Sequence, residues 1–90
     1  MNVAFRESFE KDLLRINNSI IFKQVKKLIM KLETASDISK ISNIKKLAGN
    51  KNFYRIRLGD YRVGIILNKD SIELIRILHR KEIYRYFPLD

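Results

Sequence analysis

The chain has 90 residues, of which 46% are hydrophobic, and it carries 19 Lys and Arg against 10 Asp and Glu, a formal net charge of +9. This length predicts one domain over residues 1–90, and the charge predicts an anionic partner, with nucleic acid as the first candidate. The lack of cysteine excludes disulfides, iron–sulfur clusters and thiolate zinc, and the single histidine argues against a transition-metal site, so we expect no metal and no cofactor. The apolar stretches are too short for a signal peptide or a membrane span, which predicts a cytoplasmic protein without membrane contact.

The N-terminal half predicts one short strand followed by two helices. Residues 3–5 alternate as in a strand, and apolar residues then recur at helical spacing from about residue 7 to 16 and from about 19 to 33. Two consecutive asparagines separate these helices. Residues 34–52 lack a long periodic run, which predicts a turn-rich, partly helical connector.

The stretch FYRIRLGDYRVGIIL, residues 53–67, predicts a β-hairpin. Apolar residues alternate with arginines on both sides of a Gly-Asp pair, and a two-residue loop with glycine first suits a type II′ turn. Counting outward from this loop places Arg57 opposite Arg62 and Arg55 opposite a glycine. Like charges directly across a strand pair are destabilising. The arginine face is therefore better explained by an anionic partner than by stability.

The stretch IELIRIL, residues 72–78, predicts a third strand of the same meander. Its register stays open, because a loop of two or of three residues exchanges whether Ile75 or Arg76 looks toward the basic face. Residues 79–90 follow, and Pro88 ends any helix there.

The order of these elements predicts an α+β fold with two N-terminal helices packed on one face of a small antiparallel sheet, in the sequence β-α-α-β-β-β. The apolar face of the hairpin would meet the helices. The opposite face, with the arginines, would be left open.

Cationic side chains on the predicted strands form the main candidate site. Guanidinium groups on rigid strands can grip phosphate with two hydrogen bonds and little loss of motion. The hairpin is nearly free of acidic residues that would neutralise them. The candidates are Arg55, Arg57 and Arg62, with Arg80 or Lys81 at the end of the third strand.

Aromatic residues and the histidine lie close to these cations in the sequence. Tyr84 and Tyr86 could stack on unpaired bases, although Ile83 and Phe87, four residues apart, favour a segment that covers the edge of the core. His79 has an unperturbed pKa near neutrality and is a candidate general acid or base. Further candidates for nucleic-acid binding are Lys45, Lys46, Lys51, Arg76 and Arg85, with Tyr86.

The stretch NIKKLAGNKNFYRIRLGDYRVGIIL, followed by RILHRKEIYRYFP, resembles the RelE/ParE superfamily of bacterial type II toxins. The resemblance implies a RelE-like fold and a cognate antitoxin. It also implies that Arg55 and Arg57 are the paired basic strand positions and Arg62 the phosphate-gripping arginine. The Arg80–Lys81 pair then supplies the cation at the strand end. Either Tyr84 or Tyr86 matches the terminal tyrosine, and the general base stays unassigned because arginine is a poor proton acceptor.

Two functions follow from this resemblance. RelE-like members are ribosome-dependent endoribonucleases that cleave mRNA and block translation, whereas ParE-like members share the fold and inhibit DNA gyrase without chemistry of their own. The basic face, the histidine and the tyrosines favour cleavage. We therefore expect a ribosome-dependent mRNA endoribonuclease that binds ribosome and mRNA and forms a hetero-oligomer with its antitoxin, with a gyrase inhibitor as the alternative.

Overall fold

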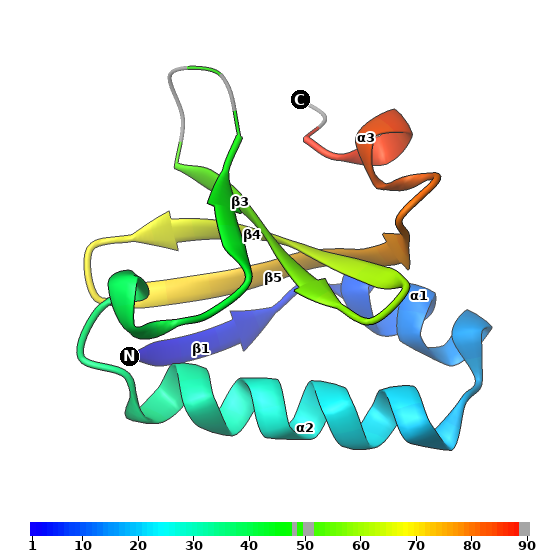
Figure 1. The fold of residues 1–90 in the computed structure, drawn as a ribbon, viewed down its shortest axis with the longest axis horizontal. Coiled ribbons are helices and arrows are strands. Elements are labelled where there is room, and N and C mark those ends of the chain that lie inside the picture. The colour runs from blue at the N-terminus through cyan, green and yellow to red at the C-terminus, as the bar shows by residue number, and fades with distance from the viewer. Residues whose placement is uncertain (48, 50–51, 89–90) are drawn as a thin grey trace.

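The computed structural model describes residues 1–47, 49 and 52–88 (Figure 1). Both long helices lie within one residue of the predicted bounds. Within the described residues, no helix combines the length and the apolarity needed to cross a membrane. The elements in chain order are β1 (Asn2–Phe5), α1 (Glu7–Ile16), α2 (Ser19–Thr34), the 3-10 helix η1 (Ile38–Lys40), β2 (Ile44–Lys46), β3 (Phe53–Leu58), β4 (Tyr61–Asn68), β5 (Ser71–His79) and α3 (Ile83–Tyr86).

The strands form one five-stranded sheet in the order β1-β5-β4-β3-β2. The predicted α+β layers are confirmed, but the prediction of a purely antiparallel sheet is wrong, because β1 runs parallel to β5. No tight turn joins β1 to its neighbour β5, so no local sequence pattern predicts whether the two strands run parallel or antiparallel. Residues 44–46, expected within the connector, form the additional edge strand β2.

The β3–β4 hairpin has the predicted register, with Arg57 opposite Arg62 and Arg55 opposite Gly64. Gly59 has φ of +62°, whereas Asp60, the second loop residue, has no positive φ. A positive φ at the first loop residue alone is the pattern of a type II′ turn. This turn therefore determines which side chains of the hairpin share a face.

A β-bulge decides the register of β5. Ile65 pairs with Leu74 on one side of the bulge and Gly64 with Arg76 on the other, which leaves Ile75 as the extra residue. Ile75 is buried in a small apolar cluster. The sequence left open whether Ile75 or Arg76 lies on the face of the hairpin arginines. Because of the bulge, both residues lie on that face.

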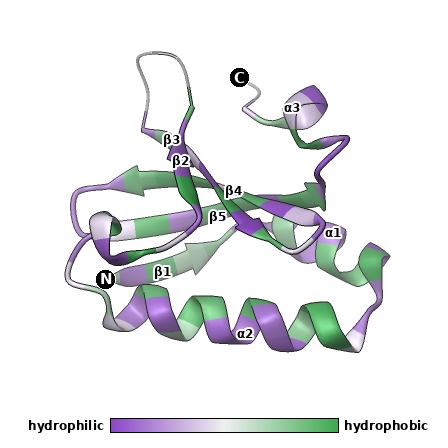
Figure 2. Ribbon diagram, in the orientation of Figure 1, coloured by the Kyte–Doolittle hydropathy of each residue, from purple (hydrophilic) through white to green (hydrophobic). Residues whose placement is uncertain are grey.

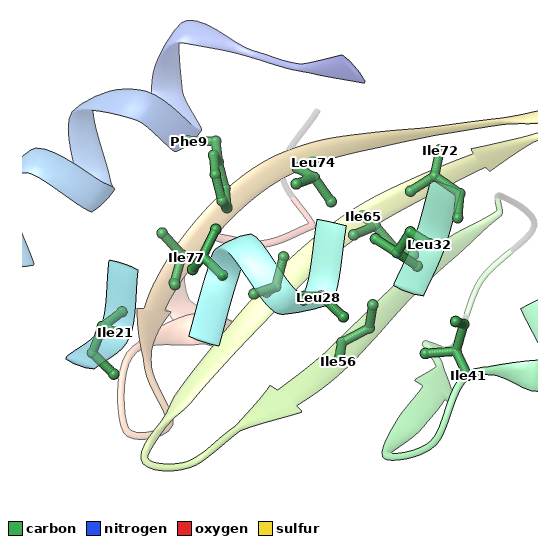
Figure 3. Close-up of a cluster of buried hydrophobic side chains, with 12 residues drawn as sticks. Phe9, Ile21, Leu28, Leu32, Ile41, Ile56, Ile65, Ile72, Leu74 and Ile77 are labelled. Carbon is green, nitrogen blue, oxygen red and sulfur yellow. The ribbon is translucent and has the colours of Figure 1, made fainter. Parts of the chain in front are cut away.

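The main core lies between α2 and the sheet. Hydrophobic and hydrophilic residues alternate along α2 (Figure 2), and its apolar stripe faces the strands (Figure 3). Full burial of such a side chain contributes about 1.5–3 kcal/mol. The buried residues of this core are Phe9, Ile21, Val25, Leu28, Leu32, Ile41, Ile56, Val63, Ile65, Ile72, Leu74 and Ile77.

The second face of the sheet is covered at one end, so the prediction of an open face is only partly right. Ile83 and Phe87 are buried there together with Ile75, as their spacing of four residues favoured. Gly64 lies directly under this segment, because a Cβ atom at this position would stand 2.6 Å from the ring of Phe87. The hairpin end with the arginines remains uncovered.

Helix α1 covers the edge of β5 beyond the end of β1. The Ser8 hydroxyl donates to the carbonyl oxygen of Ile75 (2.6 Å), and Asp12 Oδ2 accepts from the backbone N–H of Ile77 (3.1 Å). Ser8 and Asp12 are one helical turn apart, which matches the spacing of these two backbone groups. Polar side chains of α1 thus replace the missing strand partner.

Candidate functional site

Three arginines form the centre of the candidate site, on the uncovered part of the second face. Arg55 and Arg57 come from β3 and Arg62 from β4, and alternation along the strands directs all three away from α2. Within the described residues, no carboxylate lies within ion-pair distance of any of them, because the ion pairs found there use other cations. The hairpin therefore presents uncompensated positive charge.

Arg62 shows the effect of this concentration of charge. Its Nη1 donates to the carbonyl oxygens of Gly59 (2.8 Å) and Tyr61 (2.9 Å), which fixes the guanidinium at the turn. Partial burial lowers the pKa of Arg62, and the charges of Arg55 and Arg57 lower it further. An anion bound between these arginines would reverse the unfavourable charge interactions.

Helix α3 brings Tyr84 to the arginines. The Tyr84 side chain is 60% exposed, and its hydroxyl accepts a hydrogen bond from Arg55 Nε (3.3 Å). Tyr86 lies elsewhere, with its ring centroid 5.6 Å from Cζ of Arg76. Of the two tyrosines that the sequence left open, Tyr84 is therefore the one that contacts the arginine cluster.

Arg80 and Lys81 follow β5 and are exposed. The backbone N–H of Arg80 donates to the carbonyl oxygen of Asp60 (2.8 Å), which ties this segment to the hairpin turn. The charge of Arg80 is also among those that lower the pKa of Arg62. The structure thus brings the strand-end cation and the hairpin arginines together.

His79 lies on the other face of the sheet. It is opposite Tyr61 in the register, and the two rings meet edge to face with centroids 5.7 Å apart. Its Nδ1 accepts a hydrogen bond from the backbone N–H of Lys81 (3.2 Å). The structure does not bring His79 together with the arginines, because adjacent residues of a strand point to opposite faces.

Arg76 is engaged in a buried ion pair that sequence reasoning missed. Its Nε and Nη2 donate to Asp12 Oδ2 (2.6 Å) and Oδ1 (2.9 Å), and Asp12 is only 3% exposed. The hydrogen bond to Asp12 raises the pKa of Arg76. A carboxylate between Phe9 and Leu13, within the apolar stripe of α1, was the signal in the sequence. Arg76 therefore acts as a structural link between α1, β5 and α3.

Of the remaining predicted residues, Lys45 and Lys46 lie on opposite faces of the sheet. Lys45 pairs with Arg55 and shares its face, whereas Lys46 pairs with Tyr54 on the side of the helices. Arg85 is exposed on α3. Lys51 lies outside the described residues.

Comparisons with known proteins agree with this geometry. A family model described as the ParE toxin of the type II toxin-antitoxin system, parDE, matches residues 3–84. The chain belongs to the RelE/ParE superfamily of type II toxins.

Two curated relatives of this toxin come from Methanocaldococcus jannaschii. It is 43% identical to Toxin RelE3 over 89 residues, which is 98% of this chain and 100% of the relative, and 35% identical to Putative toxin RelE1 over 90% of each chain. Among solved structures, the RelB-RelE antitoxin-toxin complex from Methanococcus jannaschii matches with a TM-score of 0.80 and 41% identity, over 94% of this chain and 99% of that chain. The RelE-like fold predicted from the sequence is thus confirmed.

The toxin also has a groove of about 530 Å³ between α2 and β3. The buried residues Leu28, Ile41 and Ile56 form its apolar floor. Cations from α2, η1 and β3 surround this floor. Arg57 belongs both to this groove and to the arginine cluster, so the two features adjoin. The charged residues that line it are Lys27, Lys31, Lys40 and Arg57.

Proposed function

We propose that this toxin is a ribosome-dependent mRNA endoribonuclease that acts in the cytoplasm and blocks translation. The observation that carries the proposal is the uncompensated pair of Arg57 and Arg62, directly opposite each other on an open sheet face. Such a pair weakens the hairpin unless an anion such as a phosphodiester binds it. The two curated relatives named RelE support this branch of the superfamily.

The chemistry follows from where negative charge develops. When a ribose 2′-hydroxyl attacks the adjacent phosphate, its proton passes to solvent, a 2′,3′-cyclic phosphate forms, and the bond to the 5′-oxygen breaks as that oxygen takes up a proton. The phosphorane that precedes bond breaking carries extra negative charge. Fixed cations stabilise that charge more than they stabilise the substrate. We assign this role to Arg57 and Arg62, with Arg55 beside them.

Proton transfer requires a group other than arginine, which holds its proton too firmly. We assign protonation of the departing 5′-oxygen to Tyr84, because its hydroxyl lies 3.3 Å from Arg55 Nε at the edge of the cluster. Arg80 and Lys81 would hold the flanking phosphates, and Lys45 and Arg85 would extend the nucleic-acid surface. Arg76 and Tyr86 are left out, because Asp12 already neutralises Arg76 and Tyr86 lies over it.

Cleavage of mRNA is expected to be at least about tenfold faster on programmed ribosomes than in free RNA. The site offers many cations but few groups for proton transfer, so orientation of the 2′-hydroxyl by the ribosome must supply much of the rate. Primer extension on one mRNA, with and without ribosomes at equal toxin concentration, measures the ratio. Equal cutting of the free RNA would contradict ribosome dependence.

Inhibition of DNA gyrase is the second candidate function, and the description of the matching family model as ParE favours it. The two candidates differ in the macromolecule that is broken. Induction of the toxin in a bacterial host, followed by mapping of mRNA ends and of DNA breaks in the same cells, separates them. New mRNA ends without DNA breaks support the endoribonuclease.

We also propose an antitoxin partner with an acidic, amphipathic segment that binds the groove between α2 and β3. The apolar floor and the cationic rim of the groove support this chemistry, and the matching solved complex contains an antitoxin. Carboxylates at the rim would reach Arg57 and so reduce the charge of the arginine cluster.

Association with the cognate antitoxin is expected to slow by about tenfold or more between about 0.05 M and about 0.5 M salt, because screening removes the steering by charge. Stopped-flow mixing measures the rate. The double variant Lys27→Glu/Lys31→Glu should associate slowly even at low salt. Lys23→Glu/Lys26→Glu is the matched control, since these two exposed lysines lie on α2 but do not line the groove. Rates that do not change with salt would rule out steering.

A further inference from the structure

Asn43 has an unusual backbone for a residue with a side chain. Its φ is +61°, in the left-handed region, and it is exposed immediately before β2. Asparagine tolerates this region better than most residues, but the conformation still requires support from its surroundings. Backbone strain of this kind is concentrated at functional sites, so the contacts of Asn43 are informative.

Asn43 accepts hydrogen bonds from the arginines of β3. The backbone carbonyl oxygen of Asn43 accepts from the backbone N–H of Arg57 (2.9 Å) and from Arg55 Nη1 (3.4 Å). The side-chain oxygen Oδ1 accepts from Arg57 Nη2 (3.3 Å). One residue therefore contacts the guanidinium groups of both Arg55 and Arg57.

We propose that Asn43 is a positioning residue for the reaction, which orients Arg55 and Arg57 for phosphate through its backbone and side-chain oxygens. The inference rests on the endoribonuclease function proposed above. Arg55, Arg57 and Arg62 repel one another, and an arginine side chain has many rotamers. Without a fixed acceptor, these side chains would spread into solvent, and ordering them again would slow the reaction.

The chemistry of the amide explains why asparagine suits this position. Aspartate shares the tolerance for the left-handed region and the same oxygen position, but its carboxylate would neutralise Arg57. An amide oxygen accepts a hydrogen bond and leaves the positive charge available to the substrate. Asn43 thus orients the guanidinium of Arg57 without reducing its positive charge.

Asn43→Gly separates the side chain from the backbone. Glycine keeps the left-handed conformation and the carbonyl contacts, so the fold should be retained, while the amide is lost. We expect kcat for mRNA cleavage on ribosomes to fall by about five- to tenfold with an unchanged KM, because orientation is lost rather than binding. Asn17→Gly is the matched control, since Asn17 is the other asparagine with positive φ (48°) among the residues that the structure describes, and it ends α1.

A double-mutant cycle tests whether Asn43 acts through Arg57. In an Arg57→Ala background, Asn43→Gly should cause little further loss, because the group that it orients is gone. Asn43→Asp should make the salt dependence of RNA binding shallower by about 0.7 in the logarithmic slope, the effect of removing one phosphate contact on a single strand.

The outcomes separate the two proposals. A large loss in Arg57→Ala with full activity in Asn43→Gly, or additive losses in the cycle, would overturn the role of Asn43 and leave the endoribonuclease intact. Undiminished cleavage by Arg57→Ala would instead overturn the proposed site itself. Coupled losses, with Asn17→Gly fully active and all variants melting near the wild-type temperature, support the inference.

Discussion

Arg62→Ala is expected to lower growth inhibition and mRNA cleavage by at least about tenfold, which corresponds to about 1.4 kcal/mol of transition-state stabilisation. Arg62 points to the open face, and its loss removes one of the cations that would stabilise the phosphorane. The fold should remain intact. The carbonyls of Gly59 and Tyr61 that it contacts can bond to water instead, and the repulsion from Arg57 disappears.

Primer-extension mapping of cleaved mRNA and thermal melting of the same protein preparation measure the two halves of this prediction. Arg15→Ala is a suitable control, because its side chain is 74% exposed and belongs to α1 rather than to the hairpin. A well-folded Arg62→Ala protein with undiminished cleavage would refute the assignment of the arginine face. It would also make inhibition of gyrase the better-supported of the two candidate functions.

Val63→Asp, at the next residue, is expected to unfold the chain or to destabilise it by several kcal/mol. Val63 is 0% exposed and points into the main core beneath α2. A carboxylate without a partner in such a place is costly, and small domains have only about 5–15 kcal/mol of stability in total.

Urea or thermal unfolding of Val63→Asp beside Val63→Ala measures the effect. The alanine variant loses apolar packing but introduces no charge, so its smaller loss isolates the cost of the carboxylate. A Val63→Asp protein that melts like Val63→Ala would show that this residue is not enclosed by the helices. Together with Arg62→Ala, it tests the register set by the hairpin turn.

The parts of the fold that could be predicted depend on local signals. The two helices follow from apolar spacing and from the asparagines between them, Asn17 ending α1 with positive φ and Asn18 accepting hydrogen bonds from the start of α2. The hairpin register follows from the Gly-Asp loop alone. The parallel pairing of β1, the short strand β2 and the bulge at Ile75 depend on contacts between distant segments, which no local pattern records.

The candidate site shows the same division. Alternation along β3 and β4 was sufficient to place the three arginines on one face. The roles of Asp12 and Asn43 were not predicted, because each is defined by partners more than ten residues away in the sequence. His79 lies apart from the three arginines, because it pairs with Tyr61 on the other face of the sheet.

The edges of the sheet limit how this toxin can associate with other chains. Its two outer strands, β1 and β2, have four and three residues, and α1 occupies the edge of β5 beyond β1 with side-chain oxygens. A foreign strand could therefore form a backbone ladder over only a few residues. Short edges of this kind protect a sheet from edge-to-edge aggregation. Specific association must therefore depend on side-chain complementarity. The charged and apolar surfaces of the toxin then determine which partner it binds.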